Sequence, residues 1–484
     1  MTKTLLKPLA LAVSAALALT ACGKQESADT PAAPAGSASV AHAATAAAPS
    51  VFDISELGQA AEACTDFNQF VNAKWIAANP IPADQTVWGS FNLLREKSLA
   101  DQHALVDAAD KNADSAAPGS IEQKIGWLYR SSMNMDARNK AGFEPLKPYL
   151  AKIDALKSNK DIPAWLNQSF AKGDSAVFRF GARADYKNAS MQTAAAVQGG
   201  LGLPTPDYYT DAKYKDVRAE YVKYLAKLFE LTGTPAKDAA NQADLAMKFE
   251  TELARHSIPR VEMRKPENQY HFVTVAEANK VTPHFDWNDF FKAQGVTIDK
   301  GFSLSQPKFF AEMDKLLASA PLAEWKAYLT AHTISGAADV LSEPFVDARF
   351  DFYDKTLRGQ PEQKPQWKRS LSAVNDAMGQ ALGQLYVAKY FPPEAKARAE
   401  ELVTNIRNAL KARIQNLDWM SDETKAKAIA KWNTFLPKIG YPDKFRSWDG
   451  LTIVPDNYYA NLEAASKFNY DYDIAKIGKP TDRK

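Results

Sequence analysis

The chain has 484 residues, of which 46% are hydrophobic and 24% are charged, and its 59 basic and 57 acidic residues give a formal net charge of +2. This is the composition of a globular protein with room for roughly three domain-sized units. The charges are interspersed, so there is no electrostatic case for a nucleic-acid partner. The sequence also has no glycine-rich phosphate loop, no solenoid repeat and no zinc-ribbon cysteine spacing.

The first residues predict export and membrane attachment. Lys3 and Lys7 form a short basic region, and residues 9–19 form an apolar stretch that is too short to anchor in a bilayer. The stretch runs into Leu-Thr-Ala-Cys at residues 19–22, which resembles the bacterial lipoprotein signal, in which cleavage precedes a lipidated cysteine. We predict a lipoprotein signal peptide at residues 1–21 with lipidation of Cys22. An ordinary secretory signal is the alternative, and both interpretations make the protein extracytoplasmic.

Two features separate this signal from the folded part of the chain. Residues 22–50 are rich in Ala, Pro, Ser and Gly and have no apolar periodicity, so we predict a disordered tether there and a folded domain over residues 51–484. Cys64 is the only other cysteine, and a lone thiol is unusual in an oxidising compartment. It is either buried, which is the usual fate of a free cysteine, or its disulfide partner is not in this chain.

Most of the folded part is predicted to be helical. Apolar residues recur at helical spacing from Phe67 to about Trp75, around residues 91–99, over residues 121–132, and through much of residues 213–256, 302–338 and 367–391. Residues 177–185 alternate and predict a strand. The predicted fold class is therefore mainly α with minor β. We expect the aromatic side chains of the first two helices to lie in the core: Trp75, Trp88 and Phe91.

The clearest local pattern lies between residues 402 and 442. One helix carries an apolar face at helical spacing, formed by Leu402, Ile406, Leu410, Ile414 and Leu417. Ser421 is predicted to cap the next helix, with two acidic residues in its first turn. Gly440 and Pro442 end the run.

The six histidines predict no metal or catalytic site. No two are four residues apart and none is followed by glutamate, so the zinc motif H-E-x-x-H is absent. Glu252 and His256 lie four apart on a predicted helix, but two ligands without a third do not make a site, and a helix-surface pair is the favoured interpretation. His332 stands alone, and we expect a structural histidine with a satisfied partner.

A set of short motifs runs through the chain from residue 64 to residue 442. In order they are Cys64 with Asp66-Phe67, Trp75, Pro80 and Pro82, Trp88-Gly89-Ser90-Phe91, Leu94-Arg95, Gly200-Leu201-Gly202-Leu203-Pro204 with Tyr208-Tyr209, Gly383 with Leu385-Tyr386 and Tyr390-Phe391, Trp419-Met420, and Ile439-Gly440-Tyr441-Pro442. In order and spacing they resemble the neprilysin-like family of zinc metallopeptidases in its bacterial form, over roughly residues 51–484.

The resemblance implies the N-terminal, mostly helical lobe of that family, which caps the catalytic lobe and restricts its cavity to peptides. In the family, the H-E-x-x-H helix, a third zinc glutamate and a catalytic histidine follow the region matched by residues 439–442, and this sequence does not contain them. We therefore expect the cap domain of a truncated zinc metalloendopeptidase for extracytoplasmic proteolysis, inactive as written. Zinc is expected only in a full-length version, and peptide substrates only with a catalytic lobe.

Two rival hypotheses remain at this point. The first is a stand-alone, non-catalytic lipoprotein that binds peptides or a partner protein. The second is a peptidase with an improvised site around Glu252 and His256, which the two-ligand argument disfavours.

The resemblance also bears on individual residues. Arg95 matches a family position that faces the substrate cavity and is the candidate substrate-binding residue; a surface or structural ion pair is the alternative. Val87 stands where the mammalian neprilysin type has an arginine that binds the terminal carboxylate of the substrate, so that preference does not carry over. In many members the cysteine matched by Cys64 pairs with one near the C-terminus of the full-length enzyme, which fits its lone thiol here.

Overall fold

The computed structural model describes residues 55, 57 and 62–483, so the predicted signal peptide, Cys22 and the tether lie outside the described residues. The chain divides into two compact units, Met1–Ala77 and Ala78–Lys484. The described part of the first unit is dominated by α1 (Phe67–Ala78), which extends the predicted helix slightly beyond Trp75. Its start is capped by Asp66, whose Oδ1 accepts a hydrogen bond from the Gln69 backbone N–H at 2.9 Å.

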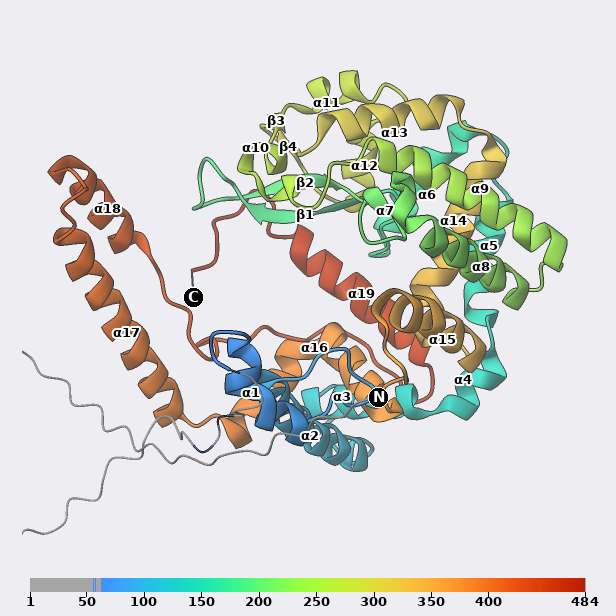
Figure 1. Ribbon diagram of the computed structural model, residues 1–484. Helices are drawn as coiled ribbons and strands as arrows, with labels where there is room; N and C mark the ends of the chain where they lie inside the picture. The colour runs from blue at the N-terminus through green and yellow to red at the C-terminus, as the bar shows by residue number, and fades with distance from the viewer. Residues whose placement is uncertain (1–54, 56, 58–61, 484) are drawn as a thin grey trace, which may run out of the picture. The chain divides into compact units, whose positions relative to one another are not determined.

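The second unit is built mostly from helices, which confirms the mainly α prediction (Figure 1). Its helices are α2 (Ser90–Asn112), α3 (Ile121–Met133), α4 (Met135–Ala141), α5 (Lys147–Asp154), α6 (Ile162–Phe170), α7 (Asp207–Thr210), α8 (Lys215–Leu231), α9 (Ala236–Arg255), α10 (Pro266–Gln269), α11 (Val275–Val281), α12 (Trp287–Gln294), α13 (Pro307–Ser319), α14 (Leu322–Ala337), α15 (Glu343–Arg349), α16 (Gln366–Tyr390), α17 (Pro393–Gln415), α18 (Asp422–Thr434) and α19 (Tyr458–Ile474). A π-helical segment, Phe350–Thr356, continues α15.

A small sheet of order β1-β2-β4-β3 lies at one side of this unit, with strands β1 (Phe178–Ala184), β2 (Gln192–Gln198), β3 (Phe272–Val273) and β4 (Phe302–Leu304). β1 and β2 form an antiparallel hairpin, β2 and β4 are parallel, and β3 is antiparallel to β4. The strand predicted at residues 177–185 is confirmed. The prediction of helix from residue 302 is wrong for its first residues, because β4 is a fully buried strand that pairs on both sides.

Three hydrophobic cores hold the second unit together. An aromatic core lies against the sheet and the helices α6, α12 and α13, where rings meet edge to face, as for Phe180 and Phe290 at 5.0 Å between centroids. A second core joins α8, α9, α14 and α15. The third joins α2, α3, α16 and α19.

The helix α19 connects regions that are far apart in the sequence. It packs against β1, α3 and α16 and crosses between the sheet side of the unit and the α2–α3–α16 group (Figure 1). Buried Asn461 donates to the Ser131 hydroxyl at 3.1 Å, and the Asp473 carboxylate accepts from the Ala182 N–H at 3.0 Å. α19 therefore separates the spaces that lie on its two sides.

The predicted helices between residues 402 and 442 form, but their apolar face is uncovered. Ser421 caps α18 as predicted, with its Oγ accepting from the Thr424 N–H at 3.3 Å. Leu402, Ile406 and Leu410 are 61%, 59% and 45% exposed, and neither α17 nor α18 has a buried residue. The periodicity therefore predicted the helix and its apolar face correctly, but only Ile414 and Leu417 of that face are partly buried, and Leu402, Ile406 and Leu410 are exposed.

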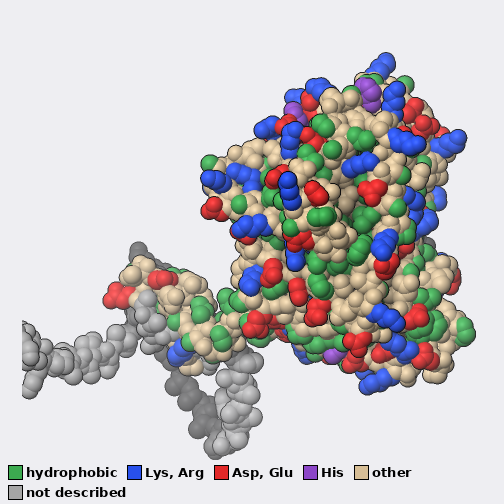
Figure 2. All heavy atoms as spheres, turned by 90° about the vertical axis from the view of Figure 1, so that its right-hand side faces the viewer, with side chains coloured by type: hydrophobic (Ala, Val, Ile, Leu, Met, Phe, Trp, Pro, Cys, Tyr) green, Lys and Arg blue, Asp and Glu red, His purple; other side chains and the backbone are tan. Residues whose placement is uncertain are grey.

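The prediction that the early aromatic residues lie in the core is wrong. Phe91 is 86% exposed, and Trp75 and Trp88 are only partly buried. Phe91 lies in the first turn of α2, whereas the buried residues of that helix are Leu105, Val106 and Ala109, two or more turns further on. Figure 2 shows one face of the molecule, on which basic, acidic and hydrophobic side chains are interspersed. Over residues 62–483, no helix combines the length and apolarity that crossing a membrane requires.

Candidate functional site

Two cavities lie on either side of α19. One, of about 620 Å³, is lined by several tyrosines and is called here the tyrosine cavity: Tyr149, Tyr221, Tyr353 and Tyr459. The other, of about 720 Å³, is called the arginine cavity after Arg95, Arg138 and Arg369. Gly336, Val340 and Leu462 line both cavities, so a thin wall from α14, its 3₁₀ extension and α19 separates them.

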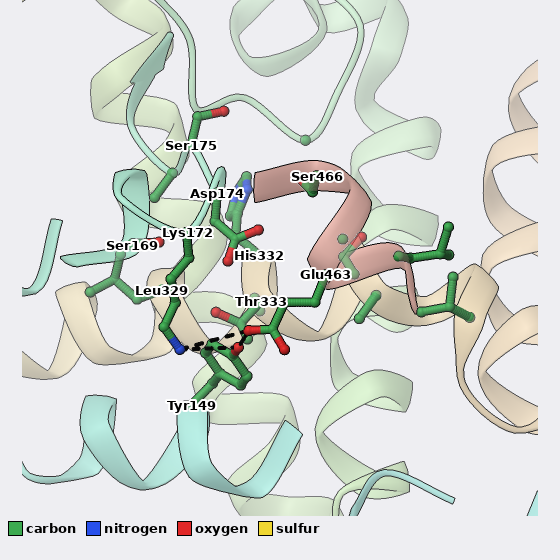
Figure 3. A pocket seen from close by; sticks show the side chains of 18 of the residues that line it. Tyr149, Ser169, Lys172, Asp174, Ser175, Leu329, His332, Thr333, Glu463 and Ser466 are labelled. Carbon is green, nitrogen blue, oxygen red and sulfur yellow. Dashed lines mark hydrogen bonds and ion pairs between the residues drawn. The ribbon is translucent and has the colours of Figure 1, made fainter. Parts of the chain in front are cut away.

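A charged group forms one side of the tyrosine cavity. Figure 3 shows Lys172, Tyr149 and Glu463 turned toward one another. Lys172 Nζ lies 3.1 Å from the Tyr149 hydroxyl and 3.7 Å from Glu463 Oε1, and the Tyr149 hydroxyl donates to that same carboxylate. Burial raises the pKa of Glu463, and burial together with the charge of Asp174 raises the pKa of Tyr459 to about 12. The group is thus polar and largely satisfied by its own members.

Behind the tyrosine cavity lies a fully buried carboxylate, Glu250. It accepts hydrogen bonds from the Gly202 N–H at 3.0 Å, from the Tyr221 hydroxyl at 2.8 Å, from the Tyr209 hydroxyl, and from His332 Nε2, which lies 2.9 Å away. Burial by itself raises the pKa of Glu250, but the His332 charge and the hydrogen bonds outweigh it, and the net pKa is below its usual value. The expectation of a partnered, structural His332 is confirmed.

This carboxylate explains the Gly-Leu-Gly-Leu-Pro motif. Gly200 has φ of +79°, and a Cβ added at Gly202 would collide with the Tyr221 hydroxyl. The Tyr353 hydroxyl donates to the Gly202 carbonyl at 3.0 Å, and Tyr209 accepts from the Leu203 N–H at 2.8 Å. The motif therefore fixes a loop against Glu250, and its role here is to shape the wall of the cavity.

The arginine cavity contains the predicted site residue Arg95. Arg95 lies on α2, its side chain is exposed, and it forms no ion pair with a described residue. The structural ion pair belongs instead to its neighbour Glu96, which lies 2.8 Å from Lys368 Nζ. Val87 is exposed and does not line this cavity.

A π-helical segment contributes to both cavities. Phe350 and Asp354 line the arginine cavity, and Tyr353, between them in sequence, lines the tyrosine cavity. π-Helical turns are rare and occur frequently at functional sites, because the extra residue redirects side chains that a regular helix would place elsewhere. Here the segment presents neighbouring residues to two cavities.

The described residues do not fit a zinc site. Among them no group of three or more His, Cys, Asp and Glu side chains is arranged to hold a metal ion. α9 ends at Arg255, where Glu252 pairs with Arg255, while His256 Nε2 lies 3.8 Å from Glu312 Oε2. Glu252 and His256 therefore each have a different partner, and the structure does not bring them together with a third ligand.

Cys64 is exposed and free in the described part of the chain. The interpretation that it is simply buried is therefore wrong. A disulfide partner outside this chain stays a prediction.

Comparison with known proteins identifies the family. Residues 63–442 match the family model for the N-terminal part of Peptidase family M13. Neprilysin-3 of Drosophila melanogaster is 28% identical over 460 residues, which cover 89% of this chain and 58% of that protein. Human endothelin-converting enzyme 1 is 26% identical, with coverage of 89% and 58%. The chain thus spans about three fifths of the length of these relatives.

Solved structures agree with the family match. The zinc metalloprotease ZMP1 of Mycobacterium tuberculosis, in complex with an inhibitor, superposes with a TM-score of 0.83 at 32% identity, covering 89% of this chain and 65% of that one. PepO of Lactobacillus rhamnosis superposes with a TM-score of 0.77 at 21% identity, covering 86% and 66%, and supports the fold. The chain belongs to peptidase family M13, and the neprilysin-like resemblance found in its motifs is confirmed.

Sequence reasoning found Arg95 but missed most of the residues that line the cavities. Glu463 lies on α19, beyond the last motif, and Lys172 follows a short helix without a distinctive pattern. Arg138 is only 6% exposed, and a charged residue at such a depth is rare. No local feature of its sequence marks it as buried, so a fold was needed to find it.

Proposed function

We propose that this chain is the N-terminal cap domain of a neprilysin-like zinc metalloendopeptidase that acts in extracytoplasmic peptide proteolysis. The match of residues 63–442 to the M13 model carries the proposal, and the two cavities beside α19 support it, since each has the volume of a site for a few residues of peptide. In this proposal the domain admits and holds peptides. The zinc ligands and the catalytic base come from a catalytic lobe.

The chain as written is proposed to be inactive. A zinc peptidase needs three protein ligands and a base that activates the metal-bound water, and the sequence has no H-E-x-x-H pair to supply them. In this proposal zinc is a cofactor of the complete enzyme only. Peptide substrates are hydrolysed only when the catalytic lobe is present.

Peptide binding without hydrolysis tests this proposal. The full chain, purified in detergent, is titrated into a fluorescein-labelled peptide, Gly-Ala-Phe-Ala-Ala, and binding is followed by fluorescence anisotropy while cleavage is followed by chromatography with and without added zinc. We expect saturable binding and no cleavage. Zinc-dependent cleavage would overturn the inactivity, and stoichiometric zinc lost in His256→Ala would support a site at that residue. Absence of binding would overturn the peptide-holding role.

A different measurement distinguishes the cap-domain proposal from the alternative, a stand-alone lipoprotein that binds peptides or a partner protein. The uncovered stripe of Leu402, Ile406 and Leu410 favours a lobe with a missing neighbour, because soluble proteins rarely leave such a contiguous apolar surface open. DNA sequencing downstream of the Lys484 codon decides between them. An H-E-x-x-H segment there, in frame or shifted, supports the cap domain, and unrelated sequence supports the stand-alone protein.

The membrane attachment is likewise a proposal. The Leu-Thr-Ala-Cys run at residues 19–22 supports a lipid anchor at Cys22 in a bacterial membrane, facing the periplasm or the cell surface. In cell fractionation we expect the chain with Cys22→Ala to leave the membrane fraction. Unchanged membrane association of this variant would rule the anchor out.

A further inference from the structure

A third cavity, of about 510 Å³, lies beside the Gly-Leu-Gly-Leu-Pro loop and is called here the loop cavity. Residues 199–201 and 203–206 form one wall of it, and most of the other lining residues come from β1, the end of β2 and the segment after α9. Ser175 and His332, which Figure 3 shows at the tyrosine cavity, line the loop cavity as well. The two cavities therefore adjoin, and a peptide held in the tyrosine cavity lies next to the loop cavity.

The charged side chains that line the loop cavity are all basic. They are Arg179, Arg260 and His332, and no Asp or Glu is among the lining residues. His332 Nε2 already lies 2.9 Å from the buried carboxylate of Glu250, which engages it. The excess positive charge of the cavity therefore belongs to the two arginines.

Arg179 reaches the cavity because of its position on β1. Side chains alternate between the two faces of a strand, and the neighbours Phe178 and Phe180 both pack in the aromatic core. Arg179 therefore lies on the opposite face, where its side chain is exposed. Its backbone position is fixed by the ladder between β1 and β2, so a rigid element carries this guanidinium.

Arg260 is brought to the same end of this hairpin by a backbone clamp. Gln198 Oε1 accepts from the Ile258 N–H at 2.9 Å, and Gln198 Nε2 donates to the Ile258 carbonyl at 2.8 Å. Gln198 lies opposite Phe178 in the ladder, one residue before Arg179. The clamp thus holds the segment that contains Arg260 beside the strand that contains Arg179.

Both arginines are available to a ligand. Each is exposed and lines the cavity, and neither side chain has an ion pair or a hydrogen bond with another of the residues that the structure describes. The carboxylates nearest to Arg260 in the sequence pair with other cations: Glu252 with Arg255, and Glu262 with Lys265.

Two further carboxylates lie on neighbouring segments without lining the loop cavity. Asp207 accepts a hydrogen bond from the Thr205 hydroxyl at the end of the loop. Asp174 lines the tyrosine cavity, and the charge of Lys172 offsets part of its own. These groups weaken the positive field around the loop cavity but do not occupy the donors of its arginines.

We propose that the loop cavity binds an acidic side chain of a peptide, with Arg179 and Arg260 donating to the carboxylate of an Asp or Glu residue. A guanidinium presents parallel N–H donors that match the two oxygens of a carboxylate. The Gly-Leu-Gly-Leu-Pro loop supplies the wall against which the side chain lies. This inference rests on the proposed peptide-holding function and gives it a preference for acidic peptides.

The test compares two unlabelled peptides by calorimetric titration of the full chain in detergent: acetyl-Gly-Glu-Phe-Glu-Ala-amide and acetyl-Gly-Gln-Phe-Gln-Ala-amide. Their blocked ends leave the glutamates as the only charges. Two charged contacts in a partly enclosed cavity predict about tenfold weaker binding of the glutamine peptide, a difference that shrinks as salt is added.

Variants locate the preference on the molecule. Arg179→Gln and Arg260→Gln are each expected to reduce the difference between the peptides, and together to abolish it. Arg264→Gln is the matched control, because Arg264 is exposed on the same segment as Arg260 but lines none of the three cavities. It is expected to keep the difference. Unfolding temperatures should stay unchanged in all of these variants, since the arginines are exposed.

The outcomes separate this inference from the function on which it rests. Equal, measurable binding of the two peptides would overturn the acidic site and leave the peptide-holding function intact, whereas no binding of either peptide overturns both. An equal loss of the preference in Arg264→Gln would assign it to general surface charge and not to the cavity. Inorganic phosphate is the third probe. If it binds through Arg179 and Arg260 while the glutamate peptide shows no preference, the site takes a small anion and the assignment to a side chain is wrong.

Discussion

The consecutive helices α16 and α17 are separated only by Phe391 and Pro392, and both carry an apolar stripe at helical spacing. In α16 the stripe lies in the core with α2, α3 and α19, where Leu371, Val374 and Met378 are completely buried. In α17 the stripe faces outward over most of its length. The apolar stripe of α16 is thus covered by other helices of this chain, whereas most of the stripe of α17 is exposed among the described residues.

The difference shows what a hydrophobic period determines. The period determines which side of a helix is apolar and tends to be buried, because side chains three and four residues apart share a face. It does not identify the element that provides the cover. α17 packs against α18, where Trp432 Nε1 donates to the Arg407 carbonyl at 3.0 Å and the Trp432 ring lies against Arg407 and Lys411. The start of α17 is held by Lys396, whose Nζ donates to the Tyr441 carbonyl at 3.0 Å.

The largest effect is expected when one leucine of the apolar stripe is shortened to alanine in each helix. Leu371→Ala removes a fully buried side chain and should lower the free energy of unfolding by about 2–5 kcal/mol. Leu402→Ala, the matched change on α17, should stay within about 0.5 kcal/mol of the unchanged protein. Urea denaturation measures both. Equal losses would show that the two stripes are equally buried in solution.

A smaller effect is expected from the polar contact between α3 and α16. The Ser132 hydroxyl donates to Ser370 Oγ at 2.8 Å, and both residues are buried. Ser370→Ala leaves the Ser132 hydroxyl without this acceptor and should lower the free energy of unfolding by about 1–3 kcal/mol. Thr404→Ala, an exposed hydroxyl on α17, is the control, and the double change Ser132→Ala with Ser370→Ala should recover part of the loss. No recovery would argue against the hydrogen bond as the cause.

The smallest change in stability is expected when the open stripe is made polar. Replacing Leu402, Ile406 and Leu410 together by Gln keeps good helix formers and should alter the free energy of unfolding by less than about 1 kcal/mol. Self-association at high concentration should fall, because exposed apolar surface drives it. Sedimentation velocity measures the association. A stability loss comparable to that of Leu371→Ala would mean that the stripe is covered in the isolated protein.

Local rules recovered the helices with clear periodicity and clear caps. The helix predicted over residues 121–132 is α3, and Ser421 caps α18 as expected. They failed for β2, whose sequence Gln-Thr-Ala-Ala-Ala-Val-Gln has no alternation of apolar and polar residues. Most of this strand is buried and it pairs with both β1 and β4, so its conformation is set by neighbours that the local sequence does not reveal.

The candidate site divides in the same way. A motif marks the position of Arg95, which lines the arginine cavity, and its role in substrate binding stays a prediction. The lack of an H-E-x-x-H motif can be read from the sequence directly. Arg138 and Arg369 could not be found, because their burial depends on distant segments. The carbonyl of Leu341 that accepts from Arg138 is 203 residues further along the chain. Sequence spacing tells little about such long-range burial.

The position of α19 has a consequence for how the protein is made. Lys124 on α3 donates to the carbonyl of Trp448, and Ser131 on α3 accepts from Asn461 on α19, across 324 and 330 residues. At usual rates of synthesis, α3 emerges roughly 15 to 65 s before these partners exist. Throughout that interval the apolar face of α3 is not yet packed against Trp448 and α19. The time needed to translate the intervening chain, rather than the rate of any single packing step, therefore sets the earliest moment at which the core around α3 is complete.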